Sequence, residues 1–249
     1  MDEGAQDVRT MCSAMVHRGP DDEGYFDEQD AHLGMRRLAI IDVAHGAQPI
    51  FNESGSVVTV LNGEIYNYRQ LVSQLRAAGH RLITESDTET IVHLYEDHGA
   101  GLVDYLRGMF ALAVWDRSSG TLTLARDRVG KKPLYYYEES GRLWFASELK
   151  CLLALASTPR EIDPVARHLY LTYKYVPNPL SIFRGIRKLP PAHRLIWCDG
   201  KTRVERYWTL QFASRDDPSP DPLPVLAEQL RQKILDATSA RMISERPLG

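Results

Sequence analysis

Cysteine is scarce in this sequence, and its three residues, Cys12, Cys151 and Cys198, lie far apart. That spacing forms neither a disulfide framework nor a CxxC pair. No run of 18 apolar residues occurs, so we expect no transmembrane helix and no membrane partner. The acidic amino terminus, Met1 to Gly4, lacks the basic and apolar regions of a secretory signal. Together these absences predict a reducing, cytoplasmic environment.

A strong charge of either sign is also missing, because the 249 residues carry a net charge of −3. A nearly neutral chain gives no reason to expect nucleic acid or an anionic membrane as a partner. The apolar share of 43% and the charged share of 25% are those of an ordinary globular protein with a core. The length suits one large domain, or one domain and part of another.

Several catalytic motifs are absent. The sequence contains no Gly-x-Ser-x-Gly, no HExxH and no Walker loop, which argues against the serine, zinc and nucleotide sites that those motifs form. Residues 127–133 are basic but lack the Gly-Lys-Ser/Thr ending, so we interpret them as a tight loop between strands. His93 and His98 are five residues apart and do not share a helical face. The other histidines show no ligand spacing either, and the sequence therefore predicts no metal site.

Apolar periodicity predicts helices and strands in mixed order. Strands are expected over 33–42 and 57–62 and, from Met109, as a series joined by short turns up to Ser147. Helices are expected over 7–16, from Asn67 to Gly79, from the capping box Ser86–Glu89 through Tyr95, and over 100–107. Further along we predict helices at 148–155 and 163–172, the second capped by Asp163, and a hairpin turning at Asp199–Gly200.

The carboxyl-terminal region has a different composition. Residues 210–224 are predicted to be a linker, since 213–224 hold four prolines together with Asp and Ser. Residues 225–243 show the apolar stripe of an amphipathic helix. We expect residues 225–249 to be the first helix of a second domain, because this helix has no later segment of the chain to pack on.

Three short segments carry groups that suit hydrolysis of a primary amide. Such a reaction needs a nucleophile with a base, donors for the oxyanion, and charged partners for the ends of the substrate. Asn62 and Gly63 can supply a side-chain amide and a backbone N–H to one point. Arg37 can hold a carboxylate and Asp87 an ammonium group. Each also has a structural interpretation, namely a strand-ending turn, a solvated strand-edge arginine and a helix N-cap respectively.

Seven blocks of sequence occur in a recognisable order: His17–Asp21, Arg37–Asp42, Asn62–Asn67, Ser86–Glu89, Gly108–Ala111, Ala125–Tyr135 and Phe145–Lys150. This series resembles the class II glutamine amidotransferase domain of glutamine-hydrolysing asparagine synthetases. The resemblance covers roughly residues 7–209. Residues 241–249 are similar to the lead-in to that family's ATP-pyrophosphatase domain.

The resemblance implies an α+β, N-terminal-nucleophile hydrolase fold, a four-layer αββα sandwich with two antiparallel sheets. Its nucleophile is a cysteine at the mature amino terminus, and the α-amino group of that cysteine is the base. Residues 1–209 would form the glutaminase domain, which hydrolyses glutamine to glutamate and ammonia. The full enzyme uses this ammonia for ATP-dependent amidation of aspartate to asparagine, with Mg and ATP bound in the synthetase domain and no cofactor in the glutaminase part.

The resemblance also implies a role for each residue of the site. Arg37 would hold the carboxylate of L-glutamine, and the backbone of the next four residues would line the pocket. The Asn62 side chain and the Gly63 N–H would form the oxyanion hole. Glu64 would contact the substrate and Asp87 would take its ammonium group. The four backbone residues are Leu38, Ala39, Ile40 and Ile41.

The sequence departs from the family pattern at its start. Asp2 follows Met1 where the family has a cysteine, and the family's first strand is missing. Cys12 lies in a helical pattern with Met11 and Met15, so we interpret it as a buried structural cysteine. We therefore expect a chain shortened at both ends, with no glutaminase activity of its own.

Other interpretations stay open on the sequence alone. The acceptor could be a carboxylate other than aspartate, as in asparagine-synthetase-like amidotransferases of cell-envelope or antibiotic pathways. The domain could instead bind glutamine without catalysis through Arg37 and Asp87, or act as a scaffold with no ligand. The oligomeric state, a homodimer included, is not determined by the sequence.

Overall fold

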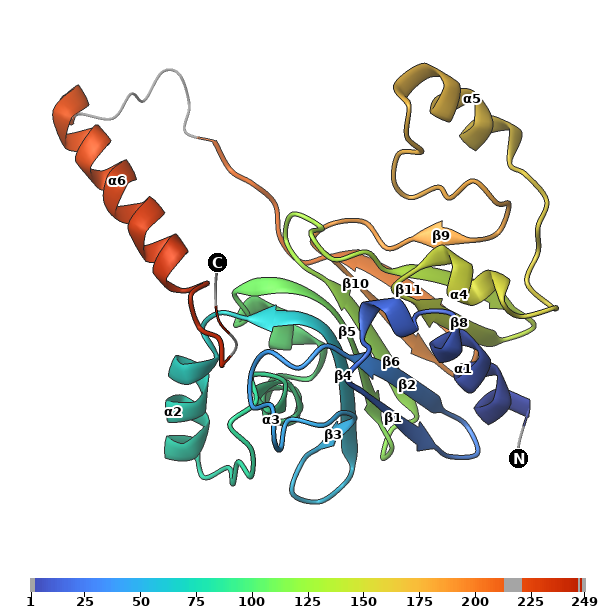
Figure 1. The fold of residues 1–249 in the computed structure, drawn as a ribbon, viewed down its shortest axis with the longest axis horizontal. Coiled ribbons are helices and arrows are strands. Elements are labelled where there is room, and N and C mark those ends of the chain that lie inside the picture. The colour runs from blue at the N-terminus through green and yellow to red at the C-terminus, as the bar shows by residue number, and fades with distance from the viewer. Residues whose placement is uncertain (1–2, 213–220, 246, 248–249) are drawn as a thin grey trace.

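The fold is given by a computed structural model that describes residues 3–212, 221–245 and 247 (Figure 1). Its helices are α1 (Glu3–Ser13), α2 (Tyr68–Ala78), α3 (Glu89–His98), α4 (Leu149–Leu153), α5 (Pro164–Tyr173) and α6 (Leu223–Ser239), with 3-10 turns η1 (Val16–Arg18) and η2 (Gly99–Asp104). Its strands are β1 (Asp22–Asp27), β2 (His32–Arg37), β3 (Ile50–Phe51), β4 (Val57–Ile65), β5 (Gly108–Asp116), β6 (Thr121–Arg126), β7 (Tyr135–Glu139), β8 (Arg142–Ala146), β9 (Arg187–Lys188), β10 (His193–Cys198) and β11 (Lys201–Arg206).

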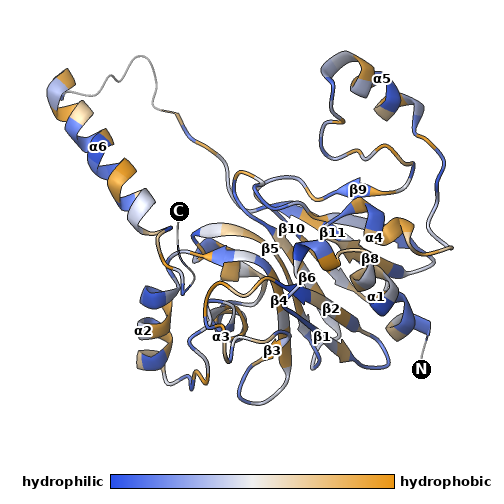
Figure 2. Ribbon diagram, in the orientation of Figure 1, coloured by the Kyte–Doolittle hydropathy of each residue, from blue (hydrophilic) through white to orange (hydrophobic). Residues whose placement is uncertain are grey.

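The largest sheet has six antiparallel strands in the order β11-β10-β6-β5-β4-β3. The long central strands β4 and β5 are apolar without alternation, because both faces of the sheet are covered. Figure 2 shows this apolar character along the middle strands. The predicted strand 57–62 is confirmed and continues to Ile65, so that Asn62 and Gly63 lie within a strand and not in a turn after it.

The second sheet expected from the resemblance is divided. The β1–β2 hairpin forms a two-stranded sheet, and β8-β7-β9 forms a three-stranded one. Both lie on the same side of the six-stranded sheet (Figure 1). The expected number of two antiparallel sheets is therefore corrected to three, with β2 and β8 as edge strands on either side of the division.

Three apolar clusters occupy the spaces between four layers. The first includes Ile91, Leu71 and Phe110 and lies between α2, α3 and the large sheet. The second includes Leu33 and Tyr136 and lies between the large sheet and the smaller sheets. The third joins Met11 of α1 and Leu152 of α4 to the outer face of β7 and β8. This is the αββα order that the resemblance implies.

Two helix predictions are confirmed at their ends. Helix α2 ends at Gly79, which adopts a left-handed φ of 105° and donates its N–H to carbonyls of the last turn. Helix α5 begins after Asp163, whose carboxylate accepts the N–H groups of Val165 and Ala166. The strands and short turns predicted from Met109 to Ser147 and the hairpin at Asp199–Gly200 are also confirmed.

Four local predictions differ from the structure in the bounds, the cap or the type of the element. The strand 33–42 ends at Arg37, and residues 38–43 form a loop. Helix α3 begins at Glu89 without a side-chain cap, since the Glu89 carboxylate accepts the N–H groups of Ile83 and Thr84 instead. The helix 100–107 is the 3-10 turn η2, and the helix 225–243 is α6, which spans Leu223–Ser239.

The carboxyl-terminal part leaves the body of the molecule and returns to it (Figure 1). The predicted linker 210–224 falls largely on residues 213–220, which lie outside the described part of the chain. Helix α6 buries none of its residues, but Ile243 beyond it packs on the first apolar cluster. None of the helices in the described residues is long and apolar enough to span a membrane.

Candidate functional site

Eight of the nine predicted substrate-binding residues line one cleft of about 1000 Å3. The cleft lies where the second sheet is divided, with β2 on one side, β8 on the other, and β4 and β5 beneath it. The ninth residue, Ala39, is buried outside the cleft, and its N–H donates to the Asp21 carboxylate at 2.9 Å. The lining residues are Arg37, Leu38, Ile40, Ile41, Asn62, Gly63, Glu64 and Asp87.

Arg37 ends β2 and organises the loop that follows it. Its guanidinium donates to the carbonyls of Ile41, Asp42 and Val43 at 3.1, 2.6 and 3.3 Å. These bonds fold residues 38–43 back over the arginine, which is only 8% exposed. Three bonds use three of the five N–H groups of a guanidinium, and the other two have no hydrogen-bond partner among the described residues.

One edge of β4 presents three backbone N–H groups in the direction of the cleft. In an antiparallel ladder the N–H groups alternate between the two neighbours of a strand. The Leu61 N–H donates to Gln48 Oε1 at 2.7 Å, and the Ile65 N–H donates to Asp87 Oδ2 at 2.8 Å. Gly63 lies midway between them, so its N–H has the same direction, away from β5. This N–H therefore points into the cleft between Gln48 and Asp87.

The opposite edge of β4 shows why position 63 must be glycine. A Cβ atom there would lie 2.0 Å from the Met109 carbonyl oxygen of β5, and φ at Gly63 is +152°. Its partner in the ladder is Phe110, whose carbonyl accepts the Asp127 N–H and whose N–H donates to the Asp127 carboxylate. Asp127 is fully buried and also accepts the N–H groups of Lys131 and Lys132, which confirms the predicted tight loop at 127–133.

The Asn62 side chain is oriented by a residue that the sequence did not single out. Its Nδ2 donates to Ser147 Oγ at 3.1 Å, and this bond joins β4 of the six-stranded sheet to the residue that follows β8 in the three-stranded sheet. Ser147 also lines the cleft. The sequence block Phe145–Lys150 contains this serine, but only the packing of β8 above β4 shows its contact with Asn62.

Replacing Ser147 with alanine should leave the Asn62 amide without its acceptor. We expect the free energy of unfolding to fall by about 1 kcal/mol and the Asn62 amide signals to show faster solvent exchange. Denaturant titration and side-chain amide NMR measure the two effects. Ser118→Ala, at an exposed turn, is the matched control, and equal behaviour of both variants would contradict the contact.

Asp87 is the most perturbed carboxyl group of the cleft. Burial raises its pKa to about 6, and the neighbouring Glu64 carboxylate acts in the same direction. The N–H of Ile65 opposes this shift by donating to the charged form. Burial also raises the pKa of Glu64. A cation entering the cleft would therefore relieve an electrostatic cost that the carboxylates carry without it.

Two of the three cysteines also line the cleft, but neither has the character of a nucleophile. Burial raises the pKa of the Cys12 thiol to about 12 and that of Cys151 to about 11. Both therefore stay protonated near neutral pH, and thiolates are the reactive form. The predicted burial of Cys12 is confirmed, since α1 packs it against Gly34 of β2.

The carboxyl-terminal segment contacts the loop that Arg37 organises. The Glu245 carboxylate accepts the N–H groups of Asp42 and Val43 at 2.9 and 3.1 Å, and the Glu245 N–H donates to the Ile40 carbonyl at 3.0 Å. Nearby, the Arg241 guanidinium lies 4.5 Å from the centre of the Tyr66 ring. Residues 241–245 thus hold the outer side of the loop at 38–43.

Known proteins are similar to this chain in fold or in sequence. A glutamine phosphoribosylpyrophosphate amidotransferase from Bacillus subtilis superposes with a TM-score of 0.64 at 19% identity, covering 84% of this chain and 48% of that one. The glutamine-hydrolysing asparagine synthetase 1 of Bacillus subtilis is 36% identical over 97% of this chain and 38% of its own. The amidase chry2 of Gibberella zeae is 32% identical over 98% and 36% respectively.

The structural similarity confirms the expected N-terminal-nucleophile hydrolase fold. The chain belongs to the glutamine amidotransferase domain family, which it matches over residues 1–208. It is homologous to the glutaminase domains of asparagine synthetases, and it spans between 33% and 50% of the length of four of these relatives.

Proposed function

We infer that this chain is the glutamine-binding part of the glutaminase domain of an asparagine synthetase. The observation that carries the proposal is the edge of β4, where the Gly63 N–H points into the cleft between two neighbouring N–H groups that already have acceptors. Asn62, held by Ser147, lines the same cleft. The Asn62 amide and the Gly63 N–H would together bind the oxyanion of a tetrahedral intermediate.

The charged residues of the cleft would hold the two ends of L-glutamine. The remaining N–H groups of Arg37 would bind the α-carboxylate, and Asp87 would bind the α-ammonium. Glu64 adds a further contact from β4, and the 38–43 loop closes one wall. In this arrangement the side-chain amide of glutamine extends toward Asn62 and Gly63, where its carbonyl oxygen develops charge.

The rest of the pathway is proposed from the relatives and not from the cleft. Ammonia would serve the amidation of aspartate in a synthetase domain that binds ATP and Mg, with no cofactor in the glutaminase part. Another carboxylate acceptor is the second candidate, because a relative named amidase chry2 is nearly as similar as the asparagine synthetases. The cytoplasm is the proposed compartment, which the three unpaired thiols support.

Calorimetric titration of the 249-residue chain with L-glutamine tests the site. We expect binding that Arg37→Ala removes, and much weaker binding of the analogue that lacks the α-amino group, because Asp87 is then left unpaired at a cost of about 2–5 kcal/mol. A scaffold without a ligand would give no heat with either compound. Equal affinity for glutamine and the analogue would refute the role of Asp87.

The same chain should release no ammonia from glutamine above background. Its cleft thiols, Cys12 and Cys151, are protonated near neutral pH and sit in packed positions. An ammonia-release assay with glutamine at saturating concentration measures this. Turnover that Cys12→Ser abolishes would contradict both the interpretation of Cys12 and the expected loss of activity.

A further inference from the structure

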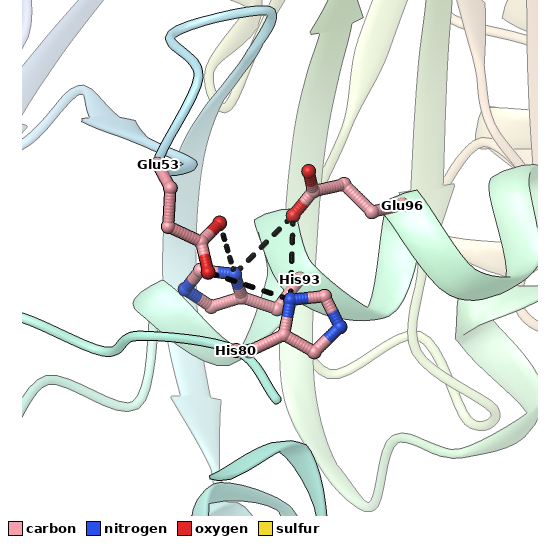
Figure 3. Close-up of side chains that lie close together, drawn as sticks. All are labelled: Glu53, His80, His93 and Glu96. Carbon is pink, nitrogen blue, oxygen red and sulfur yellow. Dashed lines mark hydrogen bonds and ion pairs between the residues drawn. The ribbon is translucent and has the colours of Figure 1, made fainter. Parts of the chain in front are cut away.

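Four side chains from three separate segments meet on the outer side of the six-stranded sheet (Figure 3). Glu53 comes from the turn between β3 and β4, His80 from the connection after α2, and His93 and Glu96 from α3. We propose that these four residues, the His80–His93 cluster, bind a divalent transition-metal ion of the zinc type. The proposal does not depend on the function proposed for the cleft, because none of the four residues lines it.

The distances between the donor atoms suit a tetrahedral ion. His93 Nδ1 lies 3.2 Å from the Glu53 carboxylate and 3.3 Å from that of Glu96, and His80 Nδ1 lies 3.5 and 3.6 Å from the same two groups. Bonds of about 2.0–2.1 Å to zinc place the ligand atoms of a tetrahedron about 3.3–3.4 Å apart. The donor atoms of the group all lie within 4.8 Å of one another.

The ligand set selects among metals. Two imidazoles and two carboxylates give four N and O donors, a set that suits Zn2+ or Co2+ better than the all-oxygen sites of Ca2+ and Mg2+. His93 and Glu96 are three residues apart on α3, so they share one face of the helix. Four protein ligands complete the coordination shell, which is the pattern of a structural site rather than a catalytic one.

The two carboxylates are held by groups outside the cluster. The Arg81 N–H donates to Glu53 Oε1 at 2.7 Å, and Asn52 Nδ2 donates to Glu96 Oε1 at 2.7 Å. Glu96 therefore has one oxygen fixed from behind and the other, Oε2, directed at both histidines. In Glu53, Oε2 faces His93, and Oε1 faces His80 as well as accepting the Arg81 N–H. Ligands of metal ions are commonly oriented in this way by a surrounding shell of hydrogen bonds.

Both histidines face a further carboxylate with their outer nitrogen. His80 Nε2 lies 3.2 Å from Asp97 Oδ1, and His93 Nε2 lies 3.7 Å from Glu89 Oε1. A carboxylate behind an imidazole favours the tautomer with its proton on that side, which leaves the Nδ1 lone pair for the metal. His93 is 1% exposed, and its Nε2 is a buried atom without a hydrogen-bond partner.

A metal ion accounts for this arrangement better than two imidazolium rings would. Each Nδ1 can carry one proton, yet each faces two carboxylates. The separations of 3.5 and 3.6 Å at His80 are also longer than ordinary N–H···O hydrogen bonds, and those of 3.2 and 3.3 Å at His93 lie near their upper limit. The ring centres are 4.9 Å apart, so two positive rings would repel each other. A single dication placed among the four side chains satisfies both nitrogens and both carboxylates.

The ion would join three segments that are separate in the sequence. It would tie the turn before β4 and the connection after α2 to α3, whose first residue follows Asp87 by two positions. It would therefore stabilise the packing of these segments and take no part in the chemistry of the cleft.

Titration of the chelator-treated chain with Co2+ and then Zn2+ tests the proposal. We expect one Co2+ per chain with the visible absorption of tetrahedral cobalt, displacement of that signal by Zn2+, and a higher melting temperature with either metal. His80→Gln should weaken zinc binding at least 100-fold, and Asp97→Asn, which removes only an outer partner, by about 10-fold.

Two controls keep the outcome clear. His98→Gln changes a histidine of the same helix that stacks on Tyr105 at 4.1 Å, and Cys198→Ser removes the least buried thiol. Both should bind zinc as the parent does. His80 is chosen for substitution rather than His93 because the His80 side chain is more exposed, so its loss is less damaging to folding. An absence of binding, or binding that His80→Gln leaves unchanged, would overturn the site.

Discussion

Replacing Asp87 with asparagine should make the chain more stable at pH 7 while removing most of its affinity for glutamine. The buried carboxylate has a pKa of about 6 instead of 3.8, which at about 1.36 kcal/mol for each pKa unit sets an upper limit of about 3 kcal/mol. Asparagine keeps an oxygen for the Ile65 N–H and carries no charge. We expect the free energy of unfolding at pH 7 to rise by about 1–3 kcal/mol.

The direction of the pH dependence follows from the raised pKa. Between pH 4 and 6 the folded protein holds a proton on Asp87 that the unfolded chain has lost, so stability falls as pH rises through this range. The stability that the protonated Asp87 provides relative to the charged form is fully present below pH 4 and is lost above pH 6. Asp87→Asn should remove this slope, and urea titrations at pH 4 and pH 7 measure it.

Glutamine binding should show the opposite dependence. The ammonium group needs the charged carboxylate, so affinity should fall about tenfold for each pH unit below the pKa of Asp87, which is about 6. Asp87→Asn should bind at least roughly 30-fold more weakly at pH 7 and lose this dependence. Glu85→Gln, at an 81% exposed side chain nearby, is the control. A variant that is less stable than the parent at pH 7 would falsify the desolvation argument.

Replacing Gly63 with alanine should be among the most damaging single changes. The added methyl group would lie 2.0 Å from the Met109 oxygen and 2.7 Å from the Phe110 Cα, both backbone atoms that cannot move without separating β4 from β5. Overpacking and an unfavourable φ together should lower the free energy of unfolding by about 3 kcal/mol or more. Glutamine affinity should be lost with it, since the Gly63 N–H moves with the strand.

Gly120 serves as a control that separates the effect of the steric contact from the effect of the positive φ. Gly120 also has a positive φ of +62°, but a Cβ atom there would meet nothing within 4 Å. Gly120→Ala should therefore cost only about 1 kcal/mol, which is the conformational term alone. If Gly63→Ala loses no more than Gly120→Ala in the same urea titration, the contact with β5 is not the constraint that we describe.

Much of the candidate site could be predicted, but only part of it from local chemistry. The residue types of Asn62, Gly63, Arg37 and Asp87 suggest a chemistry for each one singly, whereas their place in one cleft follows from the resemblance that the ordered blocks carry. The pairing of Asn62 with Ser147 could not, because 85 residues separate them and only the packing of β8 over β4 joins them. The loop at 38–43 was mistaken for a strand since its apolar residues are held by Arg37 and Asp21.

The His80–His93 cluster shows a limit of a different kind. Metal motifs are recognised by regular spacing on one element, but these ligands come from a turn, a connection and one face of a helix. The division of the second sheet was equally hidden, since β1 and β9 were not predicted and the neighbours of the other strands were not either. In both cases the sequence specifies the elements, and the long-range pairing decides what they form.

The three hydrogen bonds of Glu245 to residues 40–43 make the cleft and the carboxyl-terminal segment parts of one mechanical unit. A ligand that orders the loop at 38–43 would also strengthen the contacts of this loop with Glu245. Coupling of this kind is reciprocal, so a change in the contacts of residues 241–245 would also change the loop that lines the cleft.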